Sequence, residues 1–210
     1  MLLSDPLQAP TTLLPSLRSE YPEWHRGRPR YALWSIPVDC PVILQRRHEA
    51  RQLLGDWLHP AQGREAHISL FVCGFPCAEP CHDDDIGTAV LQAQQSVLAG
   101  LNVAPFELQL GGLDSFASAA FLGVQDNGQL EHLRQALAPL STEIRQAAYV
   151  PHLTVGIYRH AVSASQWRER AEPLRDCPPL TLAVRELQLV SYDTRELQGP
   201  LRIEAQVALA

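Results

Sequence analysis

The chain has 210 residues, 46% of them hydrophobic, and this length suits one compact domain of about 150–200 residues with a tail better than two independent domains. Its 17 basic and 23 acidic side chains give a net charge of -6, so the protein lacks the positive field that holds long nucleic-acid duplexes. This excludes duplex DNA as an expected partner, and any nucleic-acid substrate should be short or bound at one end.

No segment of the sequence suggests export or membrane insertion. The first 30 residues contain no basic stretch followed by an apolar run, and no later stretch approaches the roughly 18 apolar residues of a membrane span. The five cysteines are an odd number and fit reduced thiols better than a disulfide framework. We therefore expect a cytoplasmic protein with no membrane partner, and the sequence indicates no oligomeric state.

The chain begins with a segment unlike the rest. Residues 1–29 are rich in Pro, Ser and Thr and show no sustained period, which predicts an irregular N-terminal extension. We expect the folded domain to occupy residues 30–210.

Strands and helices alternate in the first half of the domain. Apolar alternation predicts strands over Tyr31–Pro37, Ala66–Cys73 and Phe106–Leu110. Helical spacing predicts a helix over Pro41–Leu58, and a second helix after the acidic Asp83–Asp85 with one face formed by Ile86, Val90, Ala93 and Val97.

The second half repeats this order. The predicted strands are Ala119–Val124, Val150–Tyr158, Leu182–Val190 and Leu201–Leu209, and the predicted helices are Gln129–Leu140 and Ser165–Leu174. An offset of 85 residues relates His67 to His152, and the same offset takes Ile36 to Phe121, inside the corresponding strand. The simplest interpretation is an internal duplication, approximately 30–112 and 117–210.

Two short motifs of the same form lie on corresponding strands. They read His67-Ile68-Ser69-Leu70 and His152-Leu153-Thr154-Val155. Because successive side chains of a strand point to opposite faces, each histidine shares a face with the hydroxyl residue, while the aliphatic residues face the core. Imidazoles and hydroxyls buried without a ligand would lack partners, so we expect this polar face to line an open cleft.

This set of residues suits in-line displacement at phosphorus. A neutral imidazole can take a proton from an attacking water while a protonated one gives a proton to the departing ribose oxygen, each typically worth about 10²–10⁴-fold. Histidine can do both because its unperturbed pKa is about 6.5. Ser69 and Thr154 would donate hydrogen bonds to the non-bridging oxygens. The scheme needs no metal and no other cofactor.

The paired motifs resemble those of the two-histidine (2H) phosphoesterases, which include bacterial 2'-5' RNA ligases and RNA 2',3'-cyclic phosphodiesterases. The resemblance covers about residues 30–210, and Pro151 stands before the second motif as is common in the family. It implies that His67 and His152 are the catalytic acid–base pair and that Ser69 and Thr154 bind the phosphate. It also implies an α+β fold, with two pseudo-symmetric lobes of antiparallel sheet backed by helices and the active-site cleft between them.

The sequence departs from the family pattern at two places. Ser69 stands where Thr is commoner, which keeps the hydroxyl donor. Some RNA-ligase-like members carry Arg five residues after the second histidine, where this chain has Ile157. Arg159 lies two positions later and is a candidate contact for the phosphate.

Three weaker candidates for substrate or phosphate contact remain. Tyr149 could stack on a base, but strand parity favours a role in the core. Tyr192, at the end of a late strand, is a second candidate for substrate contact. The basic cluster Arg26, Arg28 and Arg30 could meet a phosphate tail, although a solvated face is favoured.

A zinc site is the competing interpretation for one segment. Cys73, Cys77, Cys81 and His82 are suitable ligands, but all four crowd into one strand and loop. Structural zinc usually uses two separated pairs, so we predict a loop with incidental thiols and no metal.

Together these features predict a metal-independent phosphoesterase that hydrolyses 2',3'-cyclic phosphates at RNA 3' ends or on small cyclic nucleotides. The first alternative is a 2'-5' RNA ligase, which performs the same chemistry in reverse. The second is a non-catalytic module that binds RNA ends or nucleotides. The intact histidine and hydroxyl in both motifs count against the module, because binding alone needs no matched acid and base.

Overall fold

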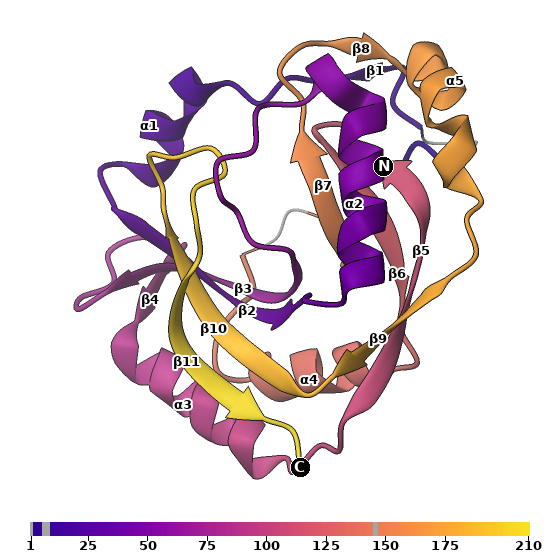
Figure 1. Ribbon diagram of the computed structural model, residues 1–210. Helices are drawn as coiled ribbons and strands as arrows, with labels where there is room; N and C mark the ends of the chain where they lie inside the picture. Colours follow the sequence, from indigo (N-terminus) through magenta and orange to yellow (C-terminus); the bar gives the residue numbers. More distant parts are fainter. Residues whose placement is uncertain (1, 6–8, 145–146) are drawn as a thin grey trace.

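A computed structural model describes residues 2–5, 9–144 and 147–210 (Figure 1). Its strands are β1 (Thr12–Leu13), β2 (Arg30–Pro37), β3 (His67–Cys77), β4 (Asp85–Gly87), β5 (Phe106–Ser115), β6 (Ala119–Gln125), β7 (His152–Ile157), β8 (Val162–Ser163), β9 (Leu180–Val184), β10 (Glu186–Asp193) and β11 (Arg202–Ala208). Its helices are α1 (Tyr21–His25), α2 (Pro41–Leu54), α3 (Thr88–Gly100), α4 (Gln129–Leu137) and α5 (Ala164–Arg175), with 3-10 turns η1 (Arg18–Glu20) and η2 (Gly55–Trp57). None of the helices in these ranges combines the length and the apolar character that a membrane span requires.

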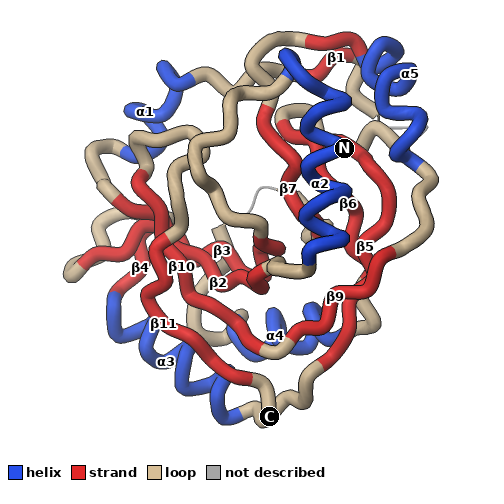
Figure 2. Tube along the Cα trace, viewed as in Figure 1, coloured by secondary structure: helices blue, strands red, loops and turns tan. Residues whose placement is uncertain are grey.

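The protein is an α+β fold built on one curled sheet. Eight strands follow the order β11-β10-β2-β3-β7-β6-β5-β9 with every neighbouring pair antiparallel, and β4 adds a short parallel pair to β3. We call β11-β10-β2-β3 the first lobe and β7-β6-β5-β9 the second lobe. Helices α3 and α4 pack on the first lobe, while α2 and α5 pack on the second (Figure 2). The predicted fold class is therefore confirmed.

The chain passes from the second lobe to the first at a point where the sequence predicts a single strand. The predicted strand Leu182–Val190 is two strands, because β9 ends at Val184 and pairs with β5, whereas β10 begins at Glu186 and pairs with β2. The buried apolar positions change phase at this point, from Leu182 and Val184 to Leu187 and Leu189. A single continuous strand could not bury both sets of residues on one face, so this phase change in the sequence indicates two strands.

Helix α3 also differs from its prediction. It begins at Thr88, so Ile86 belongs to β4, and its buried face is formed by Gln94 and Leu98. Gln94 is buried because its amide accepts a hydrogen bond from Trp34 Nε1 at 3.0 Å and donates one to Ser141 Oγ at 2.9 Å. A polar residue satisfied in this way occupies a position that periodicity alone assigns to an apolar one.

The described part of the N-terminal extension packs on the domain. It holds three short elements, β1, η1 and α1, and β1 pairs with β8. Leu3 and Leu13 are buried, and the ring of Trp24 packs against Tyr31 and Phe75 of the first lobe. The extension therefore contacts both lobes, since the Leu3 amide also donates to the Ser115 carbonyl oxygen of β5 at 2.9 Å.

The buried amide of Gln94 gives a test of the core. Gln94→Leu should lower the free energy of unfolding by about 1–3 kcal/mol, because the Trp34 indole N–H would remain buried without an acceptor. Urea unfolding measures this difference. The control is Gln92→Leu, an exposed position on the same helix, which should stay within about 0.5 kcal/mol of the wild type. Equal stability of the two variants would contradict the assignment.

Candidate active site

The register of the two central strands gathers both motifs. β3 and β7 are joined by one antiparallel pair, Ile68 and Leu153, whose side chains are fully buried. Continued in an antiparallel sense, this register places each histidine opposite the hydroxyl residue of the other motif. By strand parity the four side chains lie on the face opposite to the buried pair. They are His67, Ser69, His152 and Thr154, which we call the histidine patch, and all four are partly exposed.

Backbone carbonyls orient both imidazoles. Nδ1 of His67 lies 2.9 Å from the Glu65 carbonyl oxygen, and Nδ1 of His152 lies 2.7 Å from that of Val150. Because a carbonyl oxygen only accepts, Nδ1 carries a proton in both rings. Each carbonyl belongs to the residue two positions before its histidine, so the two rings are held alike. Nε2 is then the nitrogen of each ring that can exchange a proton with a ligand.

The electrostatic environment keeps His67 neutral. Burial is the main cause that lowers the pKa of His67 to about 4. The hydrogen bond with Glu65 raises this pKa, whereas electrostatic interactions with Arg64, Arg47 and His152 lower it. Since an unperturbed histidine has a pKa of about 6.5, His67 carries no charge at pH 7 in the unliganded protein.

Two aromatic rings pack against His152. Phe116 meets the imidazole edge-on, with ring centroids 4.9 Å apart and planes at 80°, and the centroid of Phe121 lies 5.3 Å away. Phe121 is buried, whereas Phe116, in the turn between β5 and β6, is partly exposed. The rings limit rotation of the imidazole and leave an aromatic surface beside it.

The strand edges next to the two hydroxyl residues are covered by side chains, because β3 and β7 separate beyond their single pair. Tyr149 donates its hydroxyl proton to the Ser69 carbonyl oxygen at 2.9 Å. Arg47 Nε donates to the Thr154 carbonyl oxygen at 2.9 Å. Both hydroxyl residues are thus held through their backbone.

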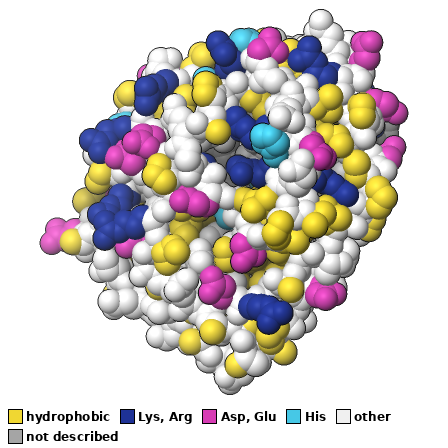
Figure 3. Space-filling view, in the orientation of Figure 1, with side chains coloured by type: hydrophobic (Ala, Val, Ile, Leu, Met, Phe, Trp, Pro, Cys, Tyr) yellow, Lys and Arg dark blue, Asp and Glu magenta, His cyan; other side chains and the backbone are white. Residues whose placement is uncertain are grey.

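Two arginines that the sequence analysis missed lie beside His67. Arg47 belongs to α2, and Arg64 precedes β3 with its guanidinium carbon 4.0 Å from the centroid of the Tyr192 ring. Arg64 could have been noticed from its place three residues before His67, whereas Arg47 depends on how α2 docks. Figure 3 shows basic side chains inside the hollow at the middle of the molecule, and all are arginines because the chain has no lysine.

The family of the protein follows from comparison with known proteins. A family model described as the 2'-5' RNA ligase superfamily matches residues 41–196, a span that includes both motifs. The chain belongs to this superfamily. A search of curated protein sequences found no match.

Solved structures of other proteins share the fold of this chain. LigT of E. coli, crystallised with 3'-AMP, is 18% identical with a TM-score of 0.62, over 87% of this chain and 99% of that chain. A Thermus thermophilus protein, TT0787, is 16% identical with a TM-score of 0.55, over 85% and 97% of the two chains. At these identities the likeness shows the common fold.

The weaker candidate residues for substrate contact lie in different parts of the structure. Tyr149, besides bonding to Ser69, has its ring 3.9 Å from the guanidinium carbon of Arg134 and packs on the core. Tyr192 lies under Arg64, and burial raises its pKa to about 12. Arg159 is exposed and lies two residues beyond the end of β7, where its amide donates to the Trp57 carbonyl oxygen at 2.9 Å. A contact between Arg159 and the phosphate stays a prediction.

The basic cluster near the N-terminus is largely neutralised. Arg28 forms ion pairs with Asp84 at 2.5 Å and Asp85 at 2.6 Å, and Arg30 pairs with Glu204 at 2.9 Å. These carboxylates occupy the donors that a phosphate tail would need.

The residues of the zinc alternative point in different directions. Cys73 is buried toward α3, with its sulfur 3.5 Å from Gln94 Oε1, whereas Cys81 is exposed. In the part of the chain that the structure describes, no three His, Cys, Asp or Glu side chains form a group that could hold a metal ion.

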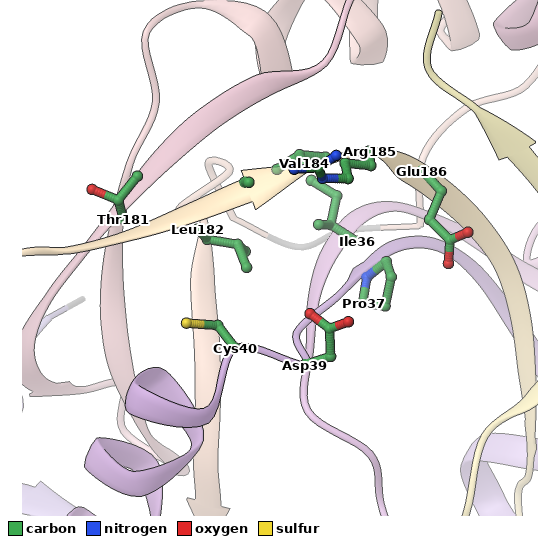
Figure 4. A pocket seen from close by; sticks show the side chains of 10 residues that line it. Ile36, Pro37, Asp39, Cys40, Thr181, Leu182, Val184, Arg185 and Glu186 are labelled. Atoms are coloured by element: carbon green, nitrogen blue, oxygen red, sulfur yellow. The ribbon is translucent and has the colours of Figure 1, made fainter.

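A cavity of about 470 Å³ opens one strand away from the histidine patch. Pro37, which lines it, pairs with His67 across β2 and β3, and two further steps of the β2–β10 register put Glu186 opposite Pro37. Both residues therefore lie on the face that carries His67. Figure 4 shows Leu182 of β9 on one wall and Asp39 of the turn before α2 on the other.

The depressed pKa of His67 can be measured directly. In the folded, unliganded protein, ¹H–¹⁵N spectra of the histidine side chains should show His67 neutral down to about pH 4, because its charged form is desolvated and repelled. The urea-unfolded protein supplies the control and should titrate near pH 6.5. A folded-state midpoint at 6.5 would contradict this description of the site.

Proposed function

We propose that this protein is a metal-independent phosphoesterase that hydrolyses 2',3'-cyclic phosphates at RNA ends or on small nucleotides by histidine acid–base catalysis. The observation that carries the proposal is that two histidines lie on one face of β3 and β7, each with Nδ1 hydrogen-bonded to a backbone carbonyl. Two imidazoles oriented in the same way can exchange protons, through Nε2, with oxygens bonded to one phosphorus atom. The five free cysteines support a cytoplasmic location.

The hydrolysis needs one neutral and one protonated imidazole. The neutral ring takes a proton from water as its oxygen bonds to phosphorus, and the protonated ring gives a proton to the 3' oxygen as the bond between that oxygen and phosphorus breaks. The product is a 2'-phosphate, as the resemblance to the 2H phosphoesterases implies. Ser69 and Thr154 donate hydrogen bonds to the non-bridging oxygens, where negative charge grows in the transition state.

The surroundings of the patch suit a nucleotide. The partly exposed ring of Phe116 offers a flat surface beside His152, on which a base can stack. The cavity lined by Pro37, the β2 partner of His67, is within the size range of small-molecule sites, about 300–1,000 Å³. The crystallisation of LigT with 3'-AMP supports a nucleotide as the kind of ligand.

Both histidines should be essential and no metal should be required. His67→Ala and His152→Ala should each lower kcat by about 10²-fold or more, as expected for loss of a positioned acid or base. Treatment of the wild type with EDTA should leave its rate unchanged. The assay follows hydrolysis of a nucleoside 2',3'-cyclic phosphate, with His132→Ala on α4 as a control that retains full activity. Activity lost to EDTA and restored by Zn²⁺ or Mg²⁺ would overturn the mechanism.

Short substrates should be sufficient. With a net charge of -6 the protein attracts a polyanion weakly at long range, so binding depends on the contacts at the site. A cyclic mononucleotide should have a kcat/KM within about tenfold of that for a long RNA with the same end, a gap of about 1.4 kcal/mol.

Chromatography of the products separates this proposal from its alternatives. Hydrolysis should give a 2'-phosphate from both substrates. Joined RNA as the main product would favour the ligase, and tight binding without any product would favour a binding module.

A further inference from the structure

Arg47 and Arg64, beside His67, differ from two other covered arginines, Arg28 and Arg134, in the groups that they bond. Arg28 and Arg134, with side chains 14% and 15% exposed, form ion pairs with Asp84 and Glu143. Among the described residues, no carboxylate lies within ion-pair distance of Arg47 or Arg64. Their hydrogen-bond partners are neutral: the Thr154 and Gly199 carbonyl oxygens and the Tyr192 hydroxyl.

Both guanidinium groups are nevertheless held in place. Arg47 Nε donates to the Thr154 carbonyl oxygen at 2.9 Å, and Arg64 Nε donates to the Gly199 carbonyl oxygen at 2.6 Å. Arg64 also lies over the ring of Tyr192. Both carbonyl hydrogen bonds use Nε, so the terminal nitrogens of each guanidinium group are left to meet a ligand, and in Arg64 the group also interacts with the Tyr192 hydroxyl.

The other charged groups close to the pair do not neutralise it. Glu65, whose charge acts on Arg64, accepts a hydrogen bond from the Leu201 amide at 2.7 Å. Arg51 adds a third positive charge near Arg47, with its own donors on the carbonyls of Val155 and His59. Burial lowers the pKa of both Arg47 and Arg64, but guanidinium groups remain charged in proteins.

The backbone contact of Arg47 and the chain position of Arg64 both place their charges near the histidine patch. The Thr154 residue that binds Arg47 is the one opposite His67 in the β3–β7 register, and Arg64 precedes the Glu65 carbonyl that holds the His67 ring. Covered positive charges without a counterion are costly, and a bound anion removes that cost.

We propose that Arg47 and Arg64 are further anion-binding residues of this site and, together with Ser69 and Thr154, hold the non-bridging oxygens of the phosphate on the His67 side. The proposal rests on the proposed phosphoesterase function and adds the residues that select for an anionic phosphoryl group. Two guanidinium groups can present paired N–H donors to phosphate oxygens, a geometry for which arginine is better suited than lysine.

Binding of inorganic phosphate tests this without any turnover. Arg47→Gln and Arg64→Gln should each raise the Kd for phosphate about tenfold or more in isothermal titration calorimetry at low salt. Arg46→Gln is the matched control, because Arg46 is the neighbour of Arg47 on α2 but bonds the Pro178 carbonyl, at 2.7 Å. It should change the Kd less than twofold. Thermal melts establish that each variant is folded.

The titration of His67 supplies a second readout, which a purely structural role for the arginines would not move. Its NMR midpoint should rise in Arg47→Gln and Arg64→Gln, because each removes a positive charge that acts on the ring, and stay unchanged in Arg46→Gln. Arg47→Lys keeps the positive charge and should bind phosphate more tightly than Arg47→Gln. It also provides a second variant at this position if Arg47→Gln is unstable.

The outcomes separate this inference from the proposed function. Folded variants with the phosphate affinity and His67 midpoint of the wild type would refute the role of the arginines, even if cyclic phosphates are hydrolysed. Phosphate binding that depends on both arginines, in a protein that hydrolyses no cyclic phosphate, would support the anion site and refute the hydrolase.

Discussion

One antiparallel pair of residues, Ile68 with Leu153, is the contact on which the site depends. Burial of these two side chains fixes the register between β3 and β7, and a shift by one residue would turn both polar motifs into the core. Because the pairing stops there, the strands separate on either side and leave space for side chains from other elements. The same contact thus aligns the histidines and opens the gap that Arg47 enters.

Carbonyl groups on the separated edges of β3 and β7 accept hydrogen bonds in equivalent ways. On β3, Arg134 donates to the Leu70 carbonyl oxygen at 2.8 Å, and on β7, Arg51 donates to that of Val155, also at 2.8 Å. Leu70 and Val155 have the same 85-residue offset as the two histidines. Arg134 belongs to α4 and Arg51 to α2, so each lobe uses a helix arginine to cap the equivalent carbonyl. This supports the internal duplication, which stays a prediction.

The sequence predicted the features that depend on neighbouring residues. Strand parity alone puts each histidine beside a hydroxyl residue, and the repeat of the motif predicts that two such strands meet. The positions of Arg47 and Gln94 could not be predicted in this way, since each is set by the docking of a helix against a distant strand. The 85-residue offset likewise does not show that the chain changes lobes at Arg185.

The route of the chain through the sheet has a consequence for how the protein unfolds. The first lobe contains β2 and β3 from the start of the domain and β10 and β11 from its end, while β5 crosses into the second lobe before the middle. A cut between β5 and β6 therefore yields no fragment with a complete lobe. Neither half can retain its hydrophobic layer alone, so both lobes should melt in a single cooperative transition, with the two histidines separating only when the whole domain is lost.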